Sequence, residues 1–265
     1  MVNLHITGTT AVFGIVADPT DHVRAPMVFN PRFAAHGRDA VMVPCHVTPE
    51  DLPAFIAGLR AQRNFHGLAV TIPHKMAIMA LCDEIGEQGR LVGAVNTIRI
   101  DADRRVHGEN FDGQGFVAGL RAEGFEVTGK AVFQTGAGGA GRAIAFAVAA
   151  AGAARLTIHN RTRAKAEELA VAVTAAYPAC RAEAVDGPDG DTEVAINTTS
   201  LGLHADDPLP IDLTTLALAA VVAEIIMIPE ETDLLVAARA AGHPVHYGRH
   251  MLDHQIRLIA DYIGA

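Results

Sequence analysis

The sequence is poor in the features that mark secreted and membrane-spanning proteins. Its three cysteines are isolated and odd in number, which indicates a reducing compartment rather than a framework of disulfides. The first residues, MVNLHITGTT, contain neither a basic segment nor a long apolar run, so no secretory signal is expected. The Ala-rich apolar stretch at residues 143–154 is too short to span a bilayer. We therefore expect a cytoplasmic protein with no membrane partner.

Positive charge is also scarce. Lys and Arg number 21 against 30 Asp and Glu, and the net charge of −9 argues against nucleic acid as a partner. The 13 histidines are scattered and show no metal-ligand spacing, so no metal is expected. Half of the 265 residues are apolar, which is enough to bury the cores of about two domains.

Residues 131–162 have the pattern of a dinucleotide-binding unit. A short apolar run at Ala131–Phe133 predicts a buried strand, and an Ala-rich run at 143–151 predicts a helix. Between them GAGGAG gives the spacing G-x-G-x-x-G, with a second strand expected at 155–159. Here the glycines permit a tight turn and close approach to a pyrophosphate, which the N–H groups of the helix N-terminus would bind. An ordinary glycine-rich turn is the alternative.

The end of the second strand indicates which dinucleotide is bound. NAD sites usually carry Asp or Glu there, but this sequence reads Asn160-Arg161-Thr162-Arg163-Ala164-Lys165. Basic side chains suit the 2′-phosphate of NADP, because a guanidinium binds phosphate through paired hydrogen bonds. The alternative is a solvated basic helix start, although cations in a first turn oppose the helix dipole. NADP is the expected cofactor, and its expected ligands are Gly136, Ala137, Gly138, Gly139, Ala140, Asn160, Arg161, Thr162 and Lys165.

Strands and helices alternate along the chain, which predicts an α/β fold. A β-hairpin is expected from Gly93–Ile100 and Arg105–Glu109. The other expected strands are 11–16, 40–43, 67–72, 194–197, 220–224 and 245–247. The other expected helices are 26–35, 48–63, 111–123, 162–177, 232–241 and 251–263, and apolar residues at helical spacing follow residue 75.

The order of several motifs resembles the shikimate dehydrogenase family over nearly the full length. Besides GAGGAG, the matching segments are VTIPHK (70–75), GAVNT (93–97), GENFDG (108–113), NRT (160–162), INTTS (196–200) and MLDHQ (251–255). The resemblance implies an N-terminal open α/β substrate domain of residues 1–111 with 250–265. It also implies a C-terminal Rossmann NADP-binding domain of residues 112–249, in which Thr199, Ile225 and Gly248 also meet the cofactor.

A catalytic pair is also implied by the resemblance. Oxidising an alcohol with NADP⁺ removes a hydride from carbon and a proton from oxygen, so the protein must supply a base. Lys75 follows a strand end and Asp112 opens a helix, and both match the family's catalytic residues. Lys75 would move the proton, while Asp112 would orient it and hydrogen-bond the reacting hydroxyl. A surface lysine and an ordinary helix-start aspartate are the alternative on the residues alone.

Three further residues match family positions that hydrogen-bond ring hydroxyls: Thr71, Asn96 and Gln255. Taken by themselves, they could equally be a strand hydroxyl, a turn amide and part of a polar helix face. His74, next to Lys75, is expected to have a structural role.

Several positions depart from the family pattern. Where the family has Ser-x-Ser-Pro, whose two hydroxyls bind the substrate carboxylate, this chain has Val23-Arg24-Ala25-Pro26. Ala69, Phe111 and Met227 stand where the family has asparagine, threonine and tyrosine. The substrate site would thus include Val23, Ala25 and Met227 as apolar groups, and a carboxylate without partners is costly to desolvate. Shikimate is therefore not expected to be the best substrate, unless Arg24, Arg249 or His250 replaces the lost contacts.

The sequence thus predicts an NADP-dependent oxidoreductase acting on a CH–OH group, of the shikimate 3-dehydrogenase type. Its partner would be shikimate or a related cyclic hydroxy compound, and a homodimer is a further candidate. One alternative is a related NADP dehydrogenase for a non-shikimate cyclic alcohol or polyol. Another is a catalytically silent sensor of NADP or ligand, against which the retained Lys75 and Asp112 argue.

Overall fold

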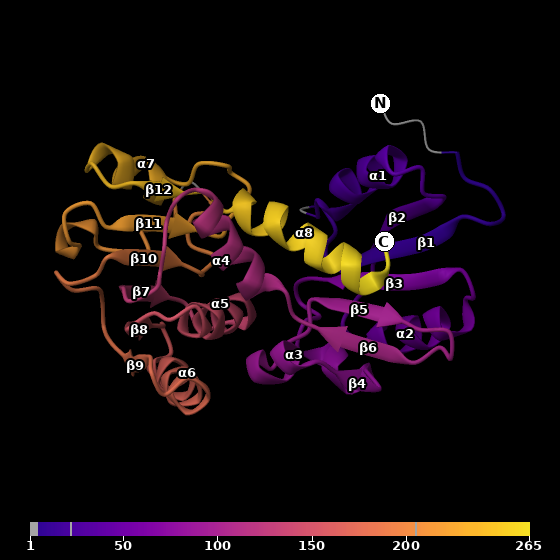
Figure 1. The fold of residues 1–265 in the computed structure, drawn as a ribbon, viewed down its shortest axis with the longest axis horizontal. Helices are drawn as coiled ribbons and strands as arrows, with labels where there is room; N and C mark the ends of the chain where they lie inside the picture. Colours follow the sequence, from indigo (N-terminus) through magenta and orange to yellow (C-terminus); the bar gives the residue numbers. More distant parts are fainter. Residues whose placement is uncertain (1–4, 22, 205) are drawn as a thin grey trace. The chain divides into compact units, whose positions relative to one another are not determined.

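The computed structural model describes residues 5–21, 23–204 and 206–265 (Figure 1). The chain divides into two compact units, Met1–Phe111 with Ile256–Ala265 and Asp112–Gln255. The predicted α/β fold with two domains is confirmed, since each unit is built around its own sheet. The sequence predicts that the chain returns to the first unit at residue 250. In the structure, residues 250–255 lie with the second unit, where Gly115 packs directly against Gln255.

The sheet of the first unit has the strand order β2-β1-β3-β5-β6-β4. The strands are β1 (Ala11–Ala17), β2 (Ala40–His46), β3 (Phe65–Val70), β4 (Glu84–Ile85), β5 (Thr97–Ile100) and β6 (Val106–Glu109). β1 lies between β2 and β3 and runs parallel to both, so the carboxyl ends of these three strands share one edge. β5 pairs antiparallel with β3 and β6, which gives the expected hairpin.

Helices α1 (Ala25–Ala35) and α2 (Leu52–Ala61) cover opposite faces of this sheet. Side chains alternate along β1, so that Phe13 packs against Phe33 of α1 with ring centroids 5.5 Å apart. Val16 instead belongs to the cluster that contains Leu52 and Ile56 of α2. The unit also contains α3 (Glu87–Val92) and η1 (Ala77–Leu81), a short 3-10 helix where the sequence showed helical spacing.

All strands of the second sheet are parallel, in the order β12-β11-β10-β7-β8-β9. They are β7 (Ala131–Thr135), β8 (Arg155–His159), β9 (Arg181–Ala184), β10 (Val194–Asn197), β11 (Val221–Glu224) and β12 (Val245–His246). From β7 the chain proceeds outward through β8 and β9, then crosses to β10 on the other side. In such sheets, ligands bind at the carboxyl ends of the strands where the order reverses, which here means β7 and β10.

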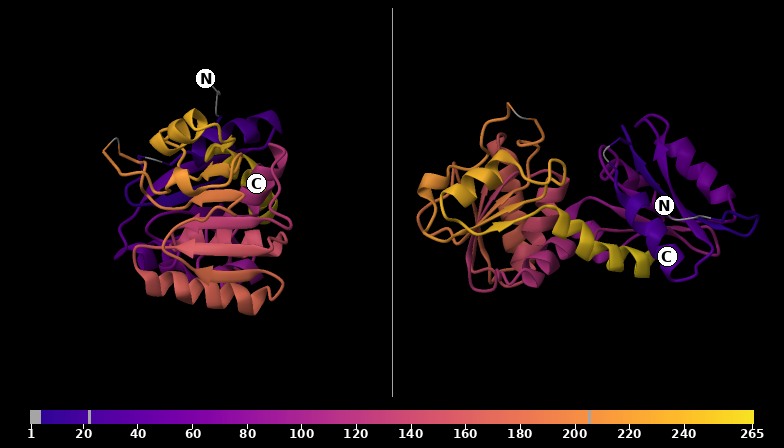
Figure 2. Two further views of the ribbon diagram at one scale, coloured as in Figure 1. Left: turned by 90° about the vertical axis from the view of Figure 1, so that its left-hand side faces the viewer. Right: turned by 90° about the horizontal axis from the view of Figure 1, so that it is seen from above.

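The connecting segments of the second unit are mainly helical: α4 (Asp112–Ala122), α5 (Gly139–Ala150), α6 (Arg163–Ala176), η2 (Leu213–Thr215), α7 (Asp233–Ala240) and α8 (Arg249–Ile263). α6 lies beside the β9 edge of the sheet (Figure 2). α8 begins in the second unit, and its residues from Ile256 onward belong to the first. Within the described ranges, no helix has the length and apolar character needed to cross a membrane.

Candidate active site

The turn between β7 and α5 is shaped for close contact with a ligand. Gly136 has φ +106°, a left-handed conformation that favours glycine, and a side chain there would overlap Thr198 Oγ1. A Cβ at Gly138 would meet no atom within 4 Å, so the backbone is open on that side. The first N–H groups of α5 have no acceptor within the helix and can bind an anion. The turn therefore fits the pyrophosphate of a dinucleotide.

Three side chains hold this turn from beneath. Gln134, fully buried in β7, donates from Nε2 to the carbonyls of Gly136 (2.8 Å) and Gly141 (2.9 Å). Thr198 Oγ1 donates to Thr135 O (2.8 Å) and Gly136 O (3.2 Å). Asn160 Oδ1 accepts from the backbone N–H of Ala137 at 3.1 Å. Sequence analysis singled out Asn160 but missed Gln134 and Thr198, although a glutamine in an apolar strand was a visible signal.

The residues after β8 carry three exposed cations: Arg161, Arg163 and Lys165. Arg163 is already engaged by Glu167 (3.0 Å) and Asp186 (2.5 Å). Among the residues that the structure describes, Arg161 and Lys165 form no ion pair, and both are exposed. They flank the N-terminus of α6, whose first N–H groups also attract an anion. This end of β8 fits the 2′-phosphate that distinguishes NADP from NAD.

A buried carboxylate that sequence analysis missed organises the ends of β10 and β11. Glu224 is fully buried, and burial raises its pKa. It accepts hydrogen bonds from Asn197 Nδ2 (2.9 Å) and Thr232 Oγ1 (3.2 Å). The backbone N–H groups of Ile225 and Ile226 donate to it as well, at 2.8 and 3.1 Å. Glu224 therefore fixes the segment that follows β11.

The remaining expected cofactor residues gather around this network. Thr199 Oγ1 donates to Asn197 Oδ1 at 2.7 Å, which ties Thr199 to the end of β10. A side chain at Gly248 would overlap the carbonyl oxygen of Ile226, so Gly248 lies directly against the backbone of Ile225 and Ile226. The second unit thus brings the glycine turn, the basic end of β8 and these residues to the carboxyl edge of one sheet.

In the first unit, the expected site residues follow the carboxyl end of β3. The N–H of Val70 donates to Asn96 O (2.7 Å), and the N–H of Val95 donates to Lys75 O (2.8 Å). These backbone bonds bring the Thr71–Lys75 turn and the Asn96 segment together. Asn96 is buried, and its Oδ1 accepts from Thr97 Oγ1 (2.9 Å) and Phe111 N (3.1 Å).

His74 anchors the turn that carries Lys75. Its side chain is fully buried, and Nε2 lies 2.9 Å from Val47 O. The backbone N–H of His74 donates to Thr71 O at 2.9 Å, and its carbonyl accepts from Ile78 N at 3.0 Å. Lys75, which follows directly, is half-buried. This geometry suits a structural role for His74.

The start of α1 offers no hydroxyl group at the same edge of the sheet. Val23 is half-buried and Ala25 is buried, as the first residue of α1. Arg24 precedes the helix and makes no capping hydrogen bond with its side chain. Two residues that sequence analysis did not name lie at the ends of β1 and β2, where His46 Nε2 is 2.8 Å from Asp18 Oδ1.

Asp112 and Gln255 belong to the second unit. Asp112 is the buried first residue of α4, and Gln255 is buried against Gly115 of the same helix. Two candidates for replacing the lost carboxylate contacts are engaged in this unit. Arg249 forms an ion pair with Glu230, and His250 Nδ1 lies 3.5 Å from Glu123 Oε1.

Comparison with known proteins decides the family. Residues 15–98 match the model of the shikimate dehydrogenase substrate binding domain. The chain is 40% identical over 259 residues to a Rhodospirillum rubrum protein named Shikimate dehydrogenase (NADP(+)), which covers 95% of this chain and 91% of the relative. The chain belongs to the shikimate dehydrogenase family.

Solved structures that are similar to this chain differ in the substrates that they are named for. The Gluconobacter sp. 5-ketofructose reductase is 32% identical, with a TM-score of 0.87 over 98% of this chain and 95% of that one. The Thermus thermophilus shikimate 5-dehydrogenase, solved with NADP(H) and shikimate, is 28% identical. Its TM-score is 0.86 over 97% of this chain and 94% of that one.

Proposed function

We propose that this family member is an NADP-dependent dehydrogenase that interconverts a CH–OH group and a carbonyl by reversible hydride transfer. The observation that carries the cofactor assignment is the pair of exposed cations, Arg161 and Lys165, beside the N-terminus of α6. Gly136–Ala140, Asn160 and Thr162 would hold the rest of the adenine-side phosphates and ribose, and Thr199, Ile225 and Gly248 the nicotinamide end. Bound NADP⁺ supplies the hydride acceptor.

The residues of the chain supply the proton chemistry in this proposal. Lys75 takes the proton of the reacting hydroxyl, and Asp112 orients Lys75 and hydrogen-bonds the same hydroxyl. Thr71, Asn96 and Gln255 hold neighbouring hydroxyls and so fix the reacting carbon in place. The family relationship also favours an enzyme over a catalytically silent sensor.

The first candidate substrate is shikimate or a related cyclic hydroxy acid, as the names of the relatives suggest. The sequence-based expectation was a shikimate 3-dehydrogenase type, whereas the Thermus thermophilus relative is named a shikimate 5-dehydrogenase. The family supports an oxidoreductase that acts on a CH–OH group. Analysis of the reaction product would identify which carbon of the ring reacts.

A neutral polyhydroxy ketone is the second candidate. Val23 and Ala25 bring no hydroxyl to the start of α1, and Met227 is apolar. A substrate carboxylate would therefore leave water without gaining hydrogen bonds from these residues, which costs free energy. The likeness to a 5-ketofructose reductase at 32% identity favours the same direction. We infer that a hydroxy compound without a carboxylate is turned over better than shikimate.

One steady-state experiment separates these candidates. Absorbance of NADPH is followed with shikimate, quinate and fructose in the oxidative direction, and with 5-ketofructose in the reductive direction. We expect NADP-dependent turnover, with the highest kcat/KM on a neutral substrate. A value of about 10⁴ M⁻¹s⁻¹ or more for shikimate, exceeded by no other compound, would contradict the neutral substrate. Absence of turnover together with tight NADP binding would instead favour a sensor.

A homodimer and a cytoplasmic location also remain predictions. The dimer is tested by light scattering coupled to size-exclusion chromatography, where an apparent mass of twice 27.8 kDa is expected. Location is tested by fractionation of cells that express the chain.

A further inference from the structure

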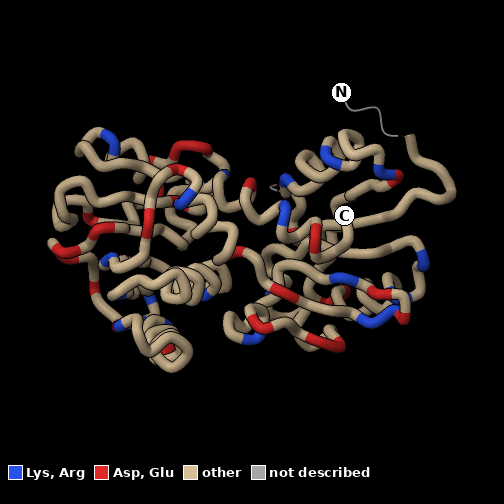
Figure 3. The backbone as a smooth tube through the Cα atoms, viewed as in Figure 1, with Lys and Arg blue, Asp and Glu red and all other residues tan. Residues whose placement is uncertain are grey.

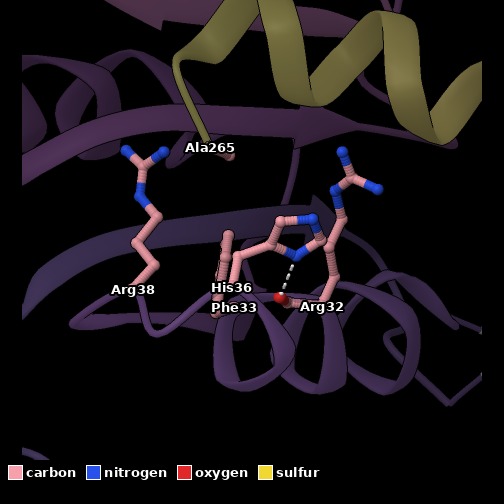
Figure 4. Close-up of a pocket in the computed structure, with 5 residues that line it drawn as sticks. All are labelled: Arg32, Phe33, His36, Arg38 and Ala265. Carbon is pink, nitrogen blue, oxygen red and sulfur yellow. Dashed lines mark hydrogen bonds between the residues drawn. The ribbon is translucent and has the colours of Figure 1, made fainter.

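A cavity of about 430 Å³ lies between the end of α1 and the last residues of the chain (Figure 4). It is lined by Arg32, Phe33, His36, Arg38 and Ala265. Arg32 and Phe33 come from the last turn of α1, and Arg38 from the connection to β2. Figure 4 shows the guanidinium groups of Arg38 and Arg32 on either side of the imidazole of His36. The volume is within the usual range for pockets that hold small molecules.

This cavity is separate from the candidate active site. Arg38 and Asp39 directly precede β2, and Ala11 at the start of β1 donates its N–H to Asp39 O at 3.0 Å. The cavity therefore lies at the amino ends of β1 and β2. Thr71 and Lys75 follow the carboxyl end of β3, which runs parallel to β1. The two sites are at opposite edges of the sheet of the first unit.

The basic groups of the cavity lack acidic partners. Across the described ranges, neither arginine nor His36 forms an ion pair, although acidic residues outnumber basic ones in the chain as a whole (Figure 3). The adjacent acid, Asp39, accepts from Thr9 Oγ1 (2.9 Å) and Thr10 Oγ1 (2.5 Å) instead. Hydrogen bonds from these threonines lower the pKa of Asp39, so it is a carboxylate held by hydroxyls rather than by Arg38.

The lining groups are already partly oriented. Arg38 donates to Gly264 O, and its guanidinium carbon lies 5.5 Å from the centre of the Phe13 ring. His36 Nδ1 is 2.8 Å from Arg32 O, so this nitrogen donates to the carbonyl and fixes the orientation of the ring. Burial lowers the pKa of nearby His66, and the charges of Arg104 and Arg38 lower it further, which indicates local positive potential.

We propose that this cavity binds a small organic anion that carries a phosphate group or at least two carboxylates. Guanidinium groups bind such oxygens through paired, charge-assisted hydrogen bonds, and two of them flank the cavity. Phe33 provides an apolar wall. An anion here would pair with guanidinium groups that form no ion pair within the described ranges.

The test uses the full chain and two probes, pyrophosphate and citrate, in isothermal titrations at an ionic strength fixed with sodium chloride. We expect at least one probe to bind with a Kd of about 1 mM or lower. Arg32→Gln and Arg38→Gln should each weaken that binding about tenfold or more, since each removes a charged pair of donors. Binding of pyrophosphate alone would identify a phosphate ligand, and binding of citrate alone a carboxylate ligand.

Two control variants make the test decisive. Arg63→Gln removes an exposed arginine elsewhere on the first unit, and Arg161→Ala removes a proposed cofactor contact. Arg63→Gln should bind the probes as the wild type does, and Arg161→Ala should retain the binding that Arg32→Gln loses. The proposal is overturned if neither probe binds, or if Arg63→Gln weakens binding as much as Arg32→Gln. It is also overturned if Arg161→Ala abolishes binding while Arg32→Gln does not, because the anion then sits at the dinucleotide turn. Arg38→Gln also removes the hydrogen bond to Gly264 O and can lower the melting temperature of the protein. If it does, the titration of Arg32→Gln alone decides the test.

Discussion

Arg161 and Arg163 are two residues apart but have different surroundings. Arg163 is held by Glu167 and Asp186, whereas Arg161 forms no ion pair in the part of the chain that the structure describes. Arg161→Ala should therefore weaken NADP binding by about 1.5–3 kcal/mol, the contribution of a charged hydrogen bond. NAD binding should be unchanged. Arg163→Ala is the matched control and should leave the ratio of the two dissociation constants unchanged. Equal losses for NADP and NAD in Arg161→Ala would remove this arginine from 2′-phosphate recognition.

Lys75 and Asp112 should act as one catalytic unit. Alanine at either position is expected to lower kcat by about 10²–10⁴ while NADP binding is retained, since the proposed cofactor contacts lie elsewhere. The double variant should be little worse than either single variant, as for residues that serve one step. If the two losses multiply in the rate measurements, the residues work independently.

Gln134 provides a test of how the glycine turn is held. Gln134→Met keeps the approximate shape of the side chain but removes the donors to Gly136 O and Gly141 O. We expect the Kd for NADP to rise about tenfold with a much smaller effect on the melting temperature, because two turn carbonyls lose their donor. Thr157→Val is the control, since Thr157 is buried in the neighbouring strand and bonds only weakly to Val132 O (3.3 Å). A similar rise in that variant would mean that general loosening of the sheet is the cause.

At the scale of elements, the β5–β6 hairpin secures α2 through Arg104. This turn residue has φ +64°, and its guanidinium donates to the carbonyls of Leu59, Arg60, Gln62 and Phe65 at 2.6–3.1 Å. The last carbonyls of a helix have no partner inside it, so Arg104 completes the end of α2.

Arg104→Ala should lower the free energy of unfolding by about 2 kcal/mol or more, as several charged hydrogen bonds are lost together. Urea denaturation measures this change. Arg105→Ala is the control, because its exposed pair with Glu84 contributes about 0–1 kcal/mol. A loss no larger for Arg104→Ala than for Arg105→Ala would show that water replaces these bonds at little cost.

Elements with a strong local pattern were predictable, and elements set by distant contacts were not. The strand–turn–helix at residues 131–150 and the hairpin around residues 101–104 agree with the structure, because apolar runs and turn residues specify them. β9, with the sequence RAEA, has no such pattern. It becomes a strand because it pairs with β8, where Arg155 holds Glu183 at 3.1 Å. Gln134 and Glu224 were missed for a related reason, since the fold alone brings their partners to them: backbone carbonyls to Gln134, and backbone N–H groups with the side chains of Asn197 and Thr232 to Glu224.

At the scale of the whole molecule, stability should depend on His246. This residue is fully buried, and burial, with the charges of His250 and His254, lowers its pKa from 6.5 to about 4. In the unfolded chain His246 is protonated below about pH 6.5, whereas in the folded chain it is protonated only below about pH 4. Stability attributable to His246 is therefore complete above pH 6.5 and falls as the pH decreases through this window, by about 3 kcal/mol.

His246→Phe should remove this dependence, because phenylalanine cannot titrate and the site already contains Phe116, at 5.6 Å between ring centroids. Denaturation of both proteins between pH 7 and 4 gives the comparison. The groups that face this histidine are His250, His254 and, through His250, Glu123, and they are unchanged in the variant. Parallel pH curves for the two proteins would assign the acid sensitivity to other groups.

The division of α8 between the two units has a consequence for synthesis on the ribosome. The first unit is discontinuous in sequence, since Ile256–Ala265 completes it, and a side chain at Gly67 of β3 would crowd Ile263. Domains generally fold in the order in which they emerge. Here the first unit emerges first, but its core is incomplete until Ile256–Ala265 has been translated. The continuous second unit can fold before it, so the nascent chain is expected to acquire protease resistance from its later half first.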